Sequence, residues 1–340
     1  MRRVAAIIIG SLLPLSFTAV ASAQDPPVPT PTPPPPAPTP TPTPPPAPAP
    51  AAGAMSLKLE RVHRLGKDQV VLRGDKLRVR GTVSPFVAGQ RVTVRLYKGR
   101  SKLAAKSVLV KPAGPNGTFL VSLKPGKGRL TVRASHRATP QQVTFTAKAK
   151  RVIGVTPSAG PGSSGPAVRL LQSRLANLRY AVARSGRFDA STGRAVTAYR
   201  KMRGWSRIGF ASRDVFRGLV AGKGRFKAKY PSHGKHVEAD LSRQVLVLLR
   251  GRKVDRIYTT SSGKASTPTV LGRFKVYQRS FGTNALGMVH SSYFIGGYAI
   301  HGYVSVPTFP ASHGCLRVPV PNALSIYNWL RIGDRVDVYP

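Results

Sequence analysis

The sequence predicts a multidomain, mainly β protein: a β-sandwich, a small three-helix bundle, and a C-terminal β-barrel or β-sandwich with one short helix. Three observations lead to this prediction. Residues 55–150 alternate apolar and polar side chains with a period of two, residues 157–222 change to helical spacing, and residues 235–340 return to strand-like runs. A chain of 340 residues is long enough for three such domains.

Residues 1–23 have the composition of an export signal peptide. Two arginines precede an almost wholly apolar run over residues 4–20, and small residues at 21–23 offer a cleavage site. The apolar run is short for a membrane span. We therefore expect export, a mature chain that begins near Gln24, and membrane contact through the signal peptide only. An uncleaved anchor is the alternative.

Residues 24–54 consist mostly of proline, threonine and alanine and carry hardly any charge. Such a segment cannot bury enough apolar surface to fold, and it favours an extended polyproline conformation. At roughly 3.1 Å per residue it would extend to about 90 Å. We predict a disordered spacer.

Residues 55–150 contain the short alternating runs of an all-β domain. Runs such as 76–80 and 92–97 are separated by turn-forming sequences such as Pro115-Asn116-Gly117. The pattern resembles immunoglobulin-like modules. The resemblance implies a spacer or adhesive domain without chemistry of its own.

Residues 157–222 have the spacing of three short helices. The first is expected to begin near Pro166, and the second to be capped near Ser191 or Thr192. The helical pattern resembles the peptidoglycan-binding module found beside many wall enzymes, on the residues Gly165, Val168, Leu171, Gln172, Leu175 and Gly186-Arg187-Phe188-Asp189. Arg200-Lys201 stands where that module usually has Phe-Gln. A helical linker without a ligand is the alternative.

The net charge of +43 is concentrated outside the C-terminal domain. Residues 235–340 carry 13 basic and 5 acidic side chains, which leaves 41 basic and 6 acidic in the preceding 234 residues. A basic surface attracts polyanions. Because the basic residues are scattered and the chain is expected to be exported, we expect no nucleic acid partner and consider anionic wall polymers instead. A contribution to solubility alone is the alternative.

Cys315 is the only cysteine of the chain, which excludes an intramolecular disulfide. It lies in Ser312-His313-Gly314-Cys315-Leu316-Arg317, with His301 upstream. A thiol attacks as the thiolate, and a neighbouring imidazole can accept its proton. This pattern indicates a cysteine nucleophile rather than a buried apolar residue.

The residues around Cys315 suggest distinct roles. His301 is expected to be the base, held as one tautomer by a carbonyl near Gly302, and His313 to shape the loop and polarise the site. The amides of Gly314 and Cys315 are candidate oxyanion donors, with Ser312 orienting the loop. Arg317 could hold a substrate carboxylate, or form a structural ion pair.

These motifs resemble the YkuD-type L,D-transpeptidase catalytic domain. The family pattern of His-Gly, a loop, and Ser/Thr-His-Gly-Cys matches His301-Gly302 and the segment from Ser312 to Arg317. The family's upstream landmarks match Ser261-x-Gly263, Thr267-Pro268 and Gly272-x-Phe274. The stretch between His301 and Ser312 has ten residues, slightly shorter than usual in the family.

The resemblance implies cross-linking of peptidoglycan in the cell wall or periplasmic space of a bacterium. Cys315 would attack the third residue of a donor tetrapeptide stem and release D-Ala, and an amine of a second stem would resolve the thioester. The partners implied are stem peptides and glycan, with carbapenem β-lactams as inhibitors. A lid over residues 288–294 would place Tyr293 against substrate. No cofactor is implied.

Other functions remain open at this stage. With water as acceptor the same residues would form an L,D-carboxypeptidase. A wall-binding scaffold without activity is the alternative from a different class, and a sortase is disfavoured by the Ser-His-Gly sequence before the cysteine. We predict no metal site, because His233 and His236 lack further ligands at useful spacing and are expected to be exposed on a linker.

Overall fold

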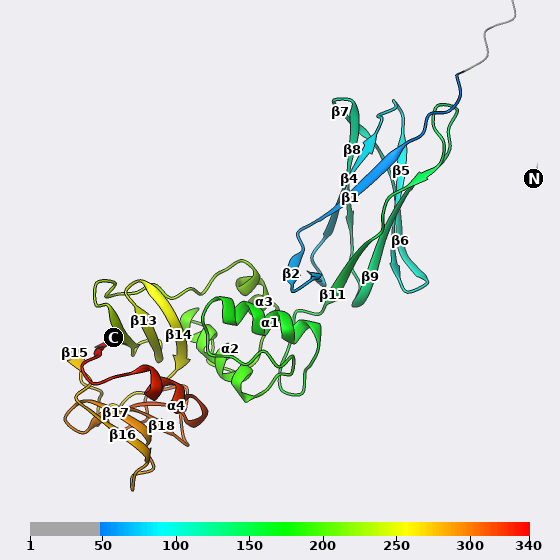
Figure 1. Ribbon diagram of the computed structural model, residues 1–340. Helices are drawn as coiled ribbons and strands as arrows, with labels where there is room; N and C mark the ends of the chain where they lie inside the picture. Colours follow the sequence, from blue (N-terminus) through cyan, green and yellow to red (C-terminus); the bar gives the residue numbers. More distant parts are fainter. Residues whose placement is uncertain (1–47) are drawn as a thin grey trace, which may run out of the picture. The chain divides into compact units, whose positions relative to one another are not determined.

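The computed structural model describes residues 48–340 (Figure 1). The predicted signal peptide and residues 24–47 of the predicted spacer lie outside the described residues. Within residues 48–340, no helix is both long enough and apolar enough to span a bilayer.

Two sheets, antiparallel except for the parallel pair β3–β11, form the N-terminal sandwich around one apolar core. In one sheet the strand order is β1-β4-β8-β7, and in the other it is β2-β3-β11-β9-β5-β6, with β10 paired to β9. The strands are β1 (Ala54–Glu60), β2 (His63–Leu65), β3 (Asp68–Leu72), β4 (Leu77–Ser84), β5 (Arg91–Lys98), β6 (Ser101–Leu109), β7 (Lys111–Ala113), β8 (Asn116–Leu123), β9 (Gly128–His136), β10 (Phe145–Thr146) and β11 (Lys150–Val155).

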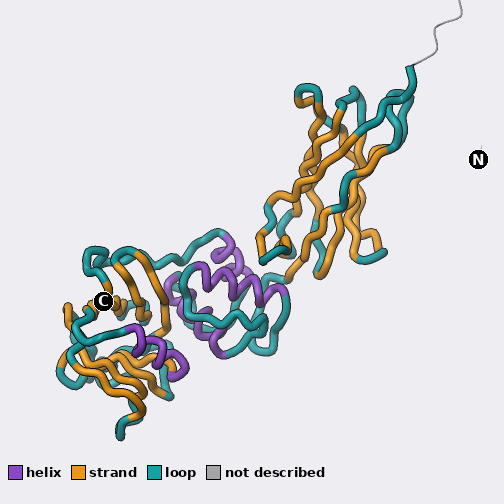
Figure 2. The backbone as a smooth tube through the Cα atoms, in the orientation of Figure 1, coloured by secondary structure: helices purple, strands orange, loops and turns teal. Residues whose placement is uncertain are grey.

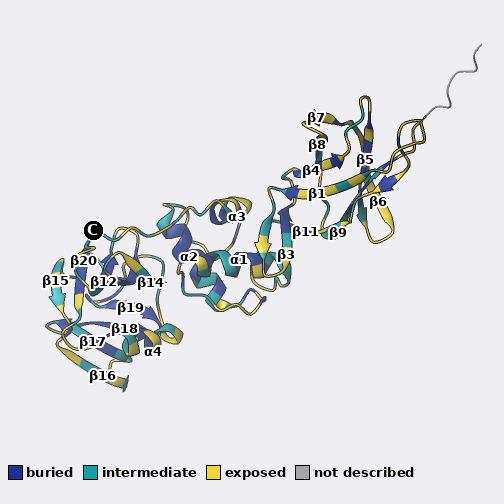
Figure 3. Cartoon of the chain, turned by 45° about the horizontal axis from the view of Figure 1, so that its top comes forward, coloured by how far each residue is buried: buried dark blue, intermediate teal, exposed yellow. Residues whose placement is uncertain are grey.

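The alternation seen in the sequence produces this core. Along β4 and β5 every second side chain is buried, as expected for strands with one face toward the interior (Figure 3). The sandwich runs past residue 150, because β11 pairs in parallel with β3 and antiparallel with β9.

Three helices follow, α1 (Pro166–Asn177), α2 (Ala190–Met202) and α3 (Arg213–Val220) (Figure 2). Pro166 stands at the start of α1, where its missing N–H costs nothing. The cap of α2 differs from the prediction: Asp189 accepts the Thr192 N–H at 2.7 Å, and Ser191 and Thr192 lie inside the first turn. A carboxylate is the stronger acceptor at this position.

The C-terminal domain consists of two sheets and one helix. The strand order is β14-β13-β12-β20-β15 in the five-stranded sheet and β16-β17-β18-β19 in the four-stranded sheet. The elements are β12 (Lys235–Asp240), β13 (Val245–Arg250), β14 (Lys253–Thr259), β15 (Gly272–Lys275), β16 (Gln278–Thr283), β17 (Val289–Ile295), β18 (Tyr298–Tyr303), β19 (Leu316–Pro319), α4 (Val320–Trp329) and β20 (Arg335–Tyr339). A single cluster of buried apolar residues from both sheets and α4 forms its core.

Candidate active site

The register of β18 and β19 brings the predicted site residues to one face. These strands are parallel, with His301 opposite Arg317. Cys315 directly precedes β19, two residues before Arg317. All three side chains line one pocket of about 450 Å³.

Cys315 is partly exposed at this pocket, so the sulfur is neither sealed nor fully solvated. The Ala299 N–H donates to Sγ at 3.4 Å, and the thiol points to the Gly297 carbonyl oxygen at 3.8 Å. Burial raises the pKa of the Cys315 thiol above its ordinary value, although the Ala299 N–H and the Arg317 charge oppose this. The resting group is therefore a thiol that needs a base.

His301 is 3% exposed and has a defined tautomer. Its Nδ1 lies 2.9 Å from the Gly302 carbonyl oxygen, which can only accept, so Nδ1 carries the proton and Nε2 has the free lone pair. Burial lowers the pKa of His301, and the positive charge of Arg317 lowers it further. A neutral imidazole and a neutral thiol that line the same pocket are the states that their surroundings favour.

The Gly314 turn determines how closely the loop approaches β18. Gly314 has φ +110°, and a Cβ there would lie 2.1 Å from the Tyr298 ring. Its N–H already donates to Ser312 Oγ at 3.1 Å, and Ser312 Oγ donates to the Cys315 carbonyl at 2.6 Å. Of the two amides predicted to bind an oxyanion, the one of Gly314 is thus occupied by Ser312.

Arg317 is held by the protein as well as facing the pocket. Its guanidinium carbon lies 4.2 Å from the centre of the Tyr303 ring, and Nη1 donates to the Ala311 carbonyl at 3.3 Å. This placement leaves a positive charge on the wall of the pocket. The alternative of a structural ion pair does not apply, since its partners here are a ring and a carbonyl.

The remaining predicted residues have different positions. His313 is exposed at the pocket, whereas Gly302 packs toward α4, where a Cβ would lie 2.7 Å from the Ala323 methyl group. Tyr293 is not one of the residues that line the pocket and lies 6.4 Å from Tyr277, ring centre to ring centre. The predicted lid over residues 288–294 is mostly strand β17.

Sequence reasoning missed four residues of the pocket, which are Leu286, Gly297, Tyr298 and Tyr303, whereas Met288 belongs to the predicted lid. A signal for Tyr303 was present, because it stands two residues after His301 on the same face of a strand. Leu286 lies on the connection between β16 and β17, for which no periodicity exists.

Within residues 48–340, no group of three His, Cys, Asp or Glu side chains is placed to hold an ion. The expected exposure of His236 was wrong. It is fully buried, with Nε2 3.2 Å from Glu238, while His233 lies 3.0 Å from Asp337. Glu238 lies two residues after His236 on the same strand, β12, whereas Asp337 lies on β20, whose pairing with β12 the sequence does not show.

The fold and this pocket are those of a cysteine enzyme built on two packed β-sheets. Residues 234–338 match the YkuD family, the L,D-transpeptidase catalytic domain. The chain is 35% identical to an L,D-transpeptidase from Xylanimonas cellulosilytica, over 54% of this chain and 98% of that one, with a TM-score of 0.49. It therefore belongs to the L,D-transpeptidases and is an enzyme of that family.

Two further solved structures resemble the chain more distantly. An L,D-transpeptidase from Stackebrandtia nassauensis is 22% identical over 55% of this chain and 98% of that one, with a TM-score of 0.36. An L,D-transpeptidase in complex with imipenem is 12% identical over 82% of this chain and 98% of that one, with a TM-score of 0.28. No curated protein matches the chain.

Proposed function

We propose that this enzyme is exported and cross-links peptidoglycan through a thioester on Cys315. The observation that carries the proposal is the common pocket of Cys315, His301 and Arg317, which combines a nucleophile, a neutral base and a cation. Membership in the L,D-transpeptidases supports the reaction class. The signal-like N-terminus supports export to the wall or periplasmic space of a bacterium.

In the acylation step, His301 Nε2 takes the thiol proton as Sγ attacks the carbonyl carbon of the third, L-configured stem residue. The tetrahedral oxyanion would be stabilised by the Cys315 amide. The peptide bond to D-Ala then breaks, and the imidazolium returns its proton to the leaving amine. The products are a thioester and free D-Ala.

In the second step an amine of a neighbouring stem attacks the thioester. His301 accepts a proton from this amine and returns it to the departing sulfur, which restores the thiol and leaves an amide between two third-position residues. Arg317 would hold a substrate carboxylate near the pocket wall. His313, exposed at the pocket, would contribute polarity there.

The same thiol would be acylated by carbapenem β-lactams. Attack on the strained lactam carbonyl opens the ring and gives a stable thioester without a leaving group. The imipenem complex of a related enzyme supports this choice of inhibitor. Because Cys315 is the only cysteine, one added mass per chain would identify the acylated residue.

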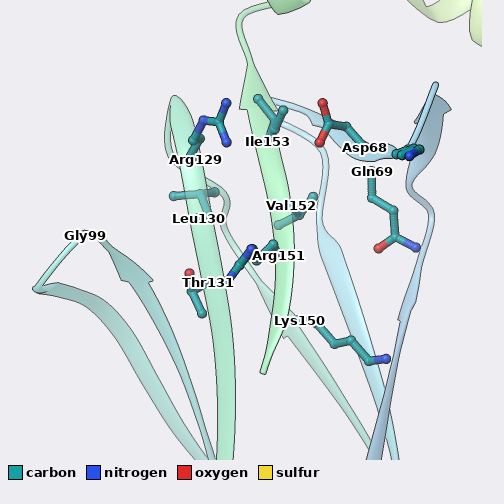
Figure 4. Close-up of a pocket in the computed structure, with 11 residues that line it drawn as sticks. Asp68, Gln69, Gly99, Arg129, Leu130, Thr131, Lys150, Arg151, Val152 and Ile153 are labelled. Atoms are coloured by element: carbon teal, nitrogen blue, oxygen red, sulfur yellow. The ribbon is translucent and has the colours of Figure 1, made fainter. Parts of the chain in front are cut away.

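The basic N-terminal half would bind anionic wall polymers. A hollow of about 610 Å³ on the sandwich has Lys67, Arg129, Lys150 and Arg151 among its lining residues (Figure 4). Four cations around one hollow raise the local concentration of a polyanion. The helical domain would add contacts to glycan.

The decisive experiment incubates the protein with purified muropeptides and separates the products by mass spectrometry. We expect dimers from the wild type, and a loss of about a thousandfold or more for Cys315→Ala, which removes the nucleophile. Trimmed tripeptides without dimers would instead assign the L,D-carboxypeptidase reaction. No product of either kind, with the fold intact, would leave only the wall-binding scaffold.

A further inference from the structure

The helical domain is built onto the edge of the catalytic sheet. The Ala181 N–H donates to the Ile257 carbonyl at 2.9 Å, and the Ile257 N–H donates to the Arg179 carbonyl at 2.8 Å. Residues 179–181 thus pair with β14, the edge strand, and α2 packs against the same strand (Figure 1). One apolar cluster includes the helices and the outer face of β13 and β14.

Lys201, near the end of α2, reaches across this junction. The residue is 2% exposed. Its ammonium donates to the Gln244 carbonyl at 2.9 Å, to Thr259 Oγ1 at 2.6 Å and to the Thr260 carbonyl at 3.0 Å. All three N–H groups therefore have partners in the catalytic domain.

A buried ammonium has a cost that an apolar residue would avoid. Burial, and then the charge of Arg207, lower the pKa of Lys201 to about 7. Its three partners are two carbonyl oxygens and a hydroxyl, so the charge is not neutralised by an acid at this contact. The presence of a lysine at this buried position is therefore explained by the three acceptors to which it donates hydrogen bonds.

Thr259 and Thr260 stand directly before Ser261, which pairs with the catalytic segment, Ser312–Arg317. Thr260 Oγ1 donates to the Arg317 carbonyl at 2.7 Å. Ser261 and Arg317 exchange two backbone hydrogen bonds, each of 3.0 Å. The position of residues 259–261 thus determines where the backbone of Arg317, two residues after Cys315, is held.

Gln244 provides a second route to the same segment. It has φ +55°, an unusual value for a residue with a side chain, and Lys201 binds its carbonyl. The Gln244 amide donates to Ser262 Oγ at 2.7 Å and accepts the Ser262 N–H at 2.9 Å. The Ser262 carbonyl in turn accepts the N–H groups of Ala311 and Ser312.

Arg207 ties the helical domain to the loop before the catalytic segment. It donates to the Thr308 carbonyl at 2.7 Å and to the Ser242 carbonyl at 2.9 Å. Thr308 belongs to the ten residues between His301 and Ser312. The neighbouring Phe309 carbonyl accepts from Ser261 Oγ at 2.7 Å.

We propose that Lys201 is a positioning residue for the active site, assisted by Arg207, so that the helical domain holds the catalytic loop as well as any ligand of its own. Lys201 acts through Thr260 and Gln244 and touches no substrate. This inference rests on the proposed function for its kinetic test only, since the positioning itself can be measured without substrate.

The first test measures Lys201→Met in the muropeptide assay. Removing the ammonium leaves three buried acceptors without a donor, so the ends of β13 and β14 shift. We expect kcat to fall at least about tenfold with KM within about twofold, because a misplaced nucleophile slows chemistry more than binding. Arg207→Met should give a smaller fall in kcat.

Two controls separate positioning from general destabilisation. Lys223→Met removes an exposed lysine of the same domain and should leave kcat unchanged. Val215→Ala opens a cavity in α3 and lowers the melting temperature without touching Lys201. If Val215→Ala, with an equal loss of melting temperature, reduces kcat as much as Lys201→Met does, the inference is wrong.

The second test measures hydrogen exchange of the ligand-free protein. Lys201→Met should accelerate exchange of the amides of Ser261, Ser312 and Arg317, while Lys223→Met should not. Unchanged exchange there, together with wild-type kcat, would overturn the inference. If the two variants show this exchange pattern but the wild type forms no muropeptide product, the proposed function alone is refuted. If Lys201→Met does not fold, Arg207→Met decides both measurements.

Discussion

The sandwich and the catalytic domain have similar architecture but different interiors. Each consists of two packed sheets, yet the sandwich buries only three polar side chains, Gln90, His136 and Gln142, among the described residues. The catalytic domain buries fourteen. Burying a polar group costs free energy unless it is hydrogen-bonded. The catalytic domain therefore contains more buried polar side chains that need hydrogen-bond partners, and these bonds fix the positions of the atoms that they join.

Several of the buried polar groups of the catalytic domain lie around the loop that carries Cys315. Thr260, Ser261, Ser262 and Ser312 hydrogen-bond the backbone that carries Cys315. In the sandwich, by contrast, His136 Nδ1 bonds the Arg91 carbonyl and connects two strands. The same kind of contact is structural in one domain and orients a reactive group in the other.

The largest expected effect compares the two buried histidines. His301→Gln should reduce transpeptidation by roughly 10²–10⁴-fold, because the base is lost. His136→Gln removes a histidine whose Nδ1 also bonds a carbonyl, at 2.9 Å, and should leave kcat unchanged. Product formation measured by mass spectrometry checks both. Equal effects of the two substitutions would remove His301 from the mechanism.

A second comparison uses one core leucine from each domain. Leu96 and Leu316 are both fully buried, so truncation to alanine should lower the free energy of unfolding by about 2–5 kcal/mol in each case. At a temperature where both variants remain folded, only Leu316→Ala should lower kcat, since Leu316 follows Cys315. Denaturant unfolding and steady-state kinetics measure the two quantities. A loss of kcat in Leu96→Ala would contradict the separation.

The sequence predicted contacts between residues near one another in the chain, and it did not predict contacts between distant segments. The cluster Cys315, His301 and Arg317 was predicted because motif residues close in sequence on adjacent strands remain close in space. The positions of Tyr293 and Lys201 were not predicted. That of Tyr293 depends on strand pairing and that of Lys201 on the packing of one domain against another, and both involve residues far apart in the chain. The burial of His236 and Glu238, two residues apart on β12, likewise depends on strand pairing, because β12 lies between β13 and β20.

A third prediction compares two arginines that stack on tyrosines. Arg317 over Tyr303 and Arg133 over Tyr97 have similar geometry, at 4.2 and 5.2 Å. The positive charge of Arg317 lowers the pKa of Cys315 and also that of His301. In Arg317→Gln both pKa values should rise, so thiolate formation requires a higher pH and the base becomes protonated at a higher pH.

Alkylation of Cys315 by iodoacetamide reports the thiol directly, because no substrate carboxylate is involved and the chain has no second cysteine. The pH midpoint of the alkylation rate should move upward in Arg317→Gln and remain in place in Arg133→Gln. The acid limb of the transpeptidation rate should also move upward in Arg317→Gln. A downward movement of either would reverse the assigned electrostatics.

The smallest expected effect concerns surface charge. Arg151→Gln removes a cation from the hollow on the sandwich, and Arg335→Gln removes an exposed cation from the catalytic domain. If the hollow concentrates cations for a polymer, Arg151→Gln should weaken retention on a phosphate polymer by roughly a few-fold, and added salt should abolish the difference. Equal retention of the two variants would mean that only net charge matters. In that case the sandwich would hold the enzyme at a distance rather than at a polymer, because a scattered charge attracts any polyanion without fixing where it lies.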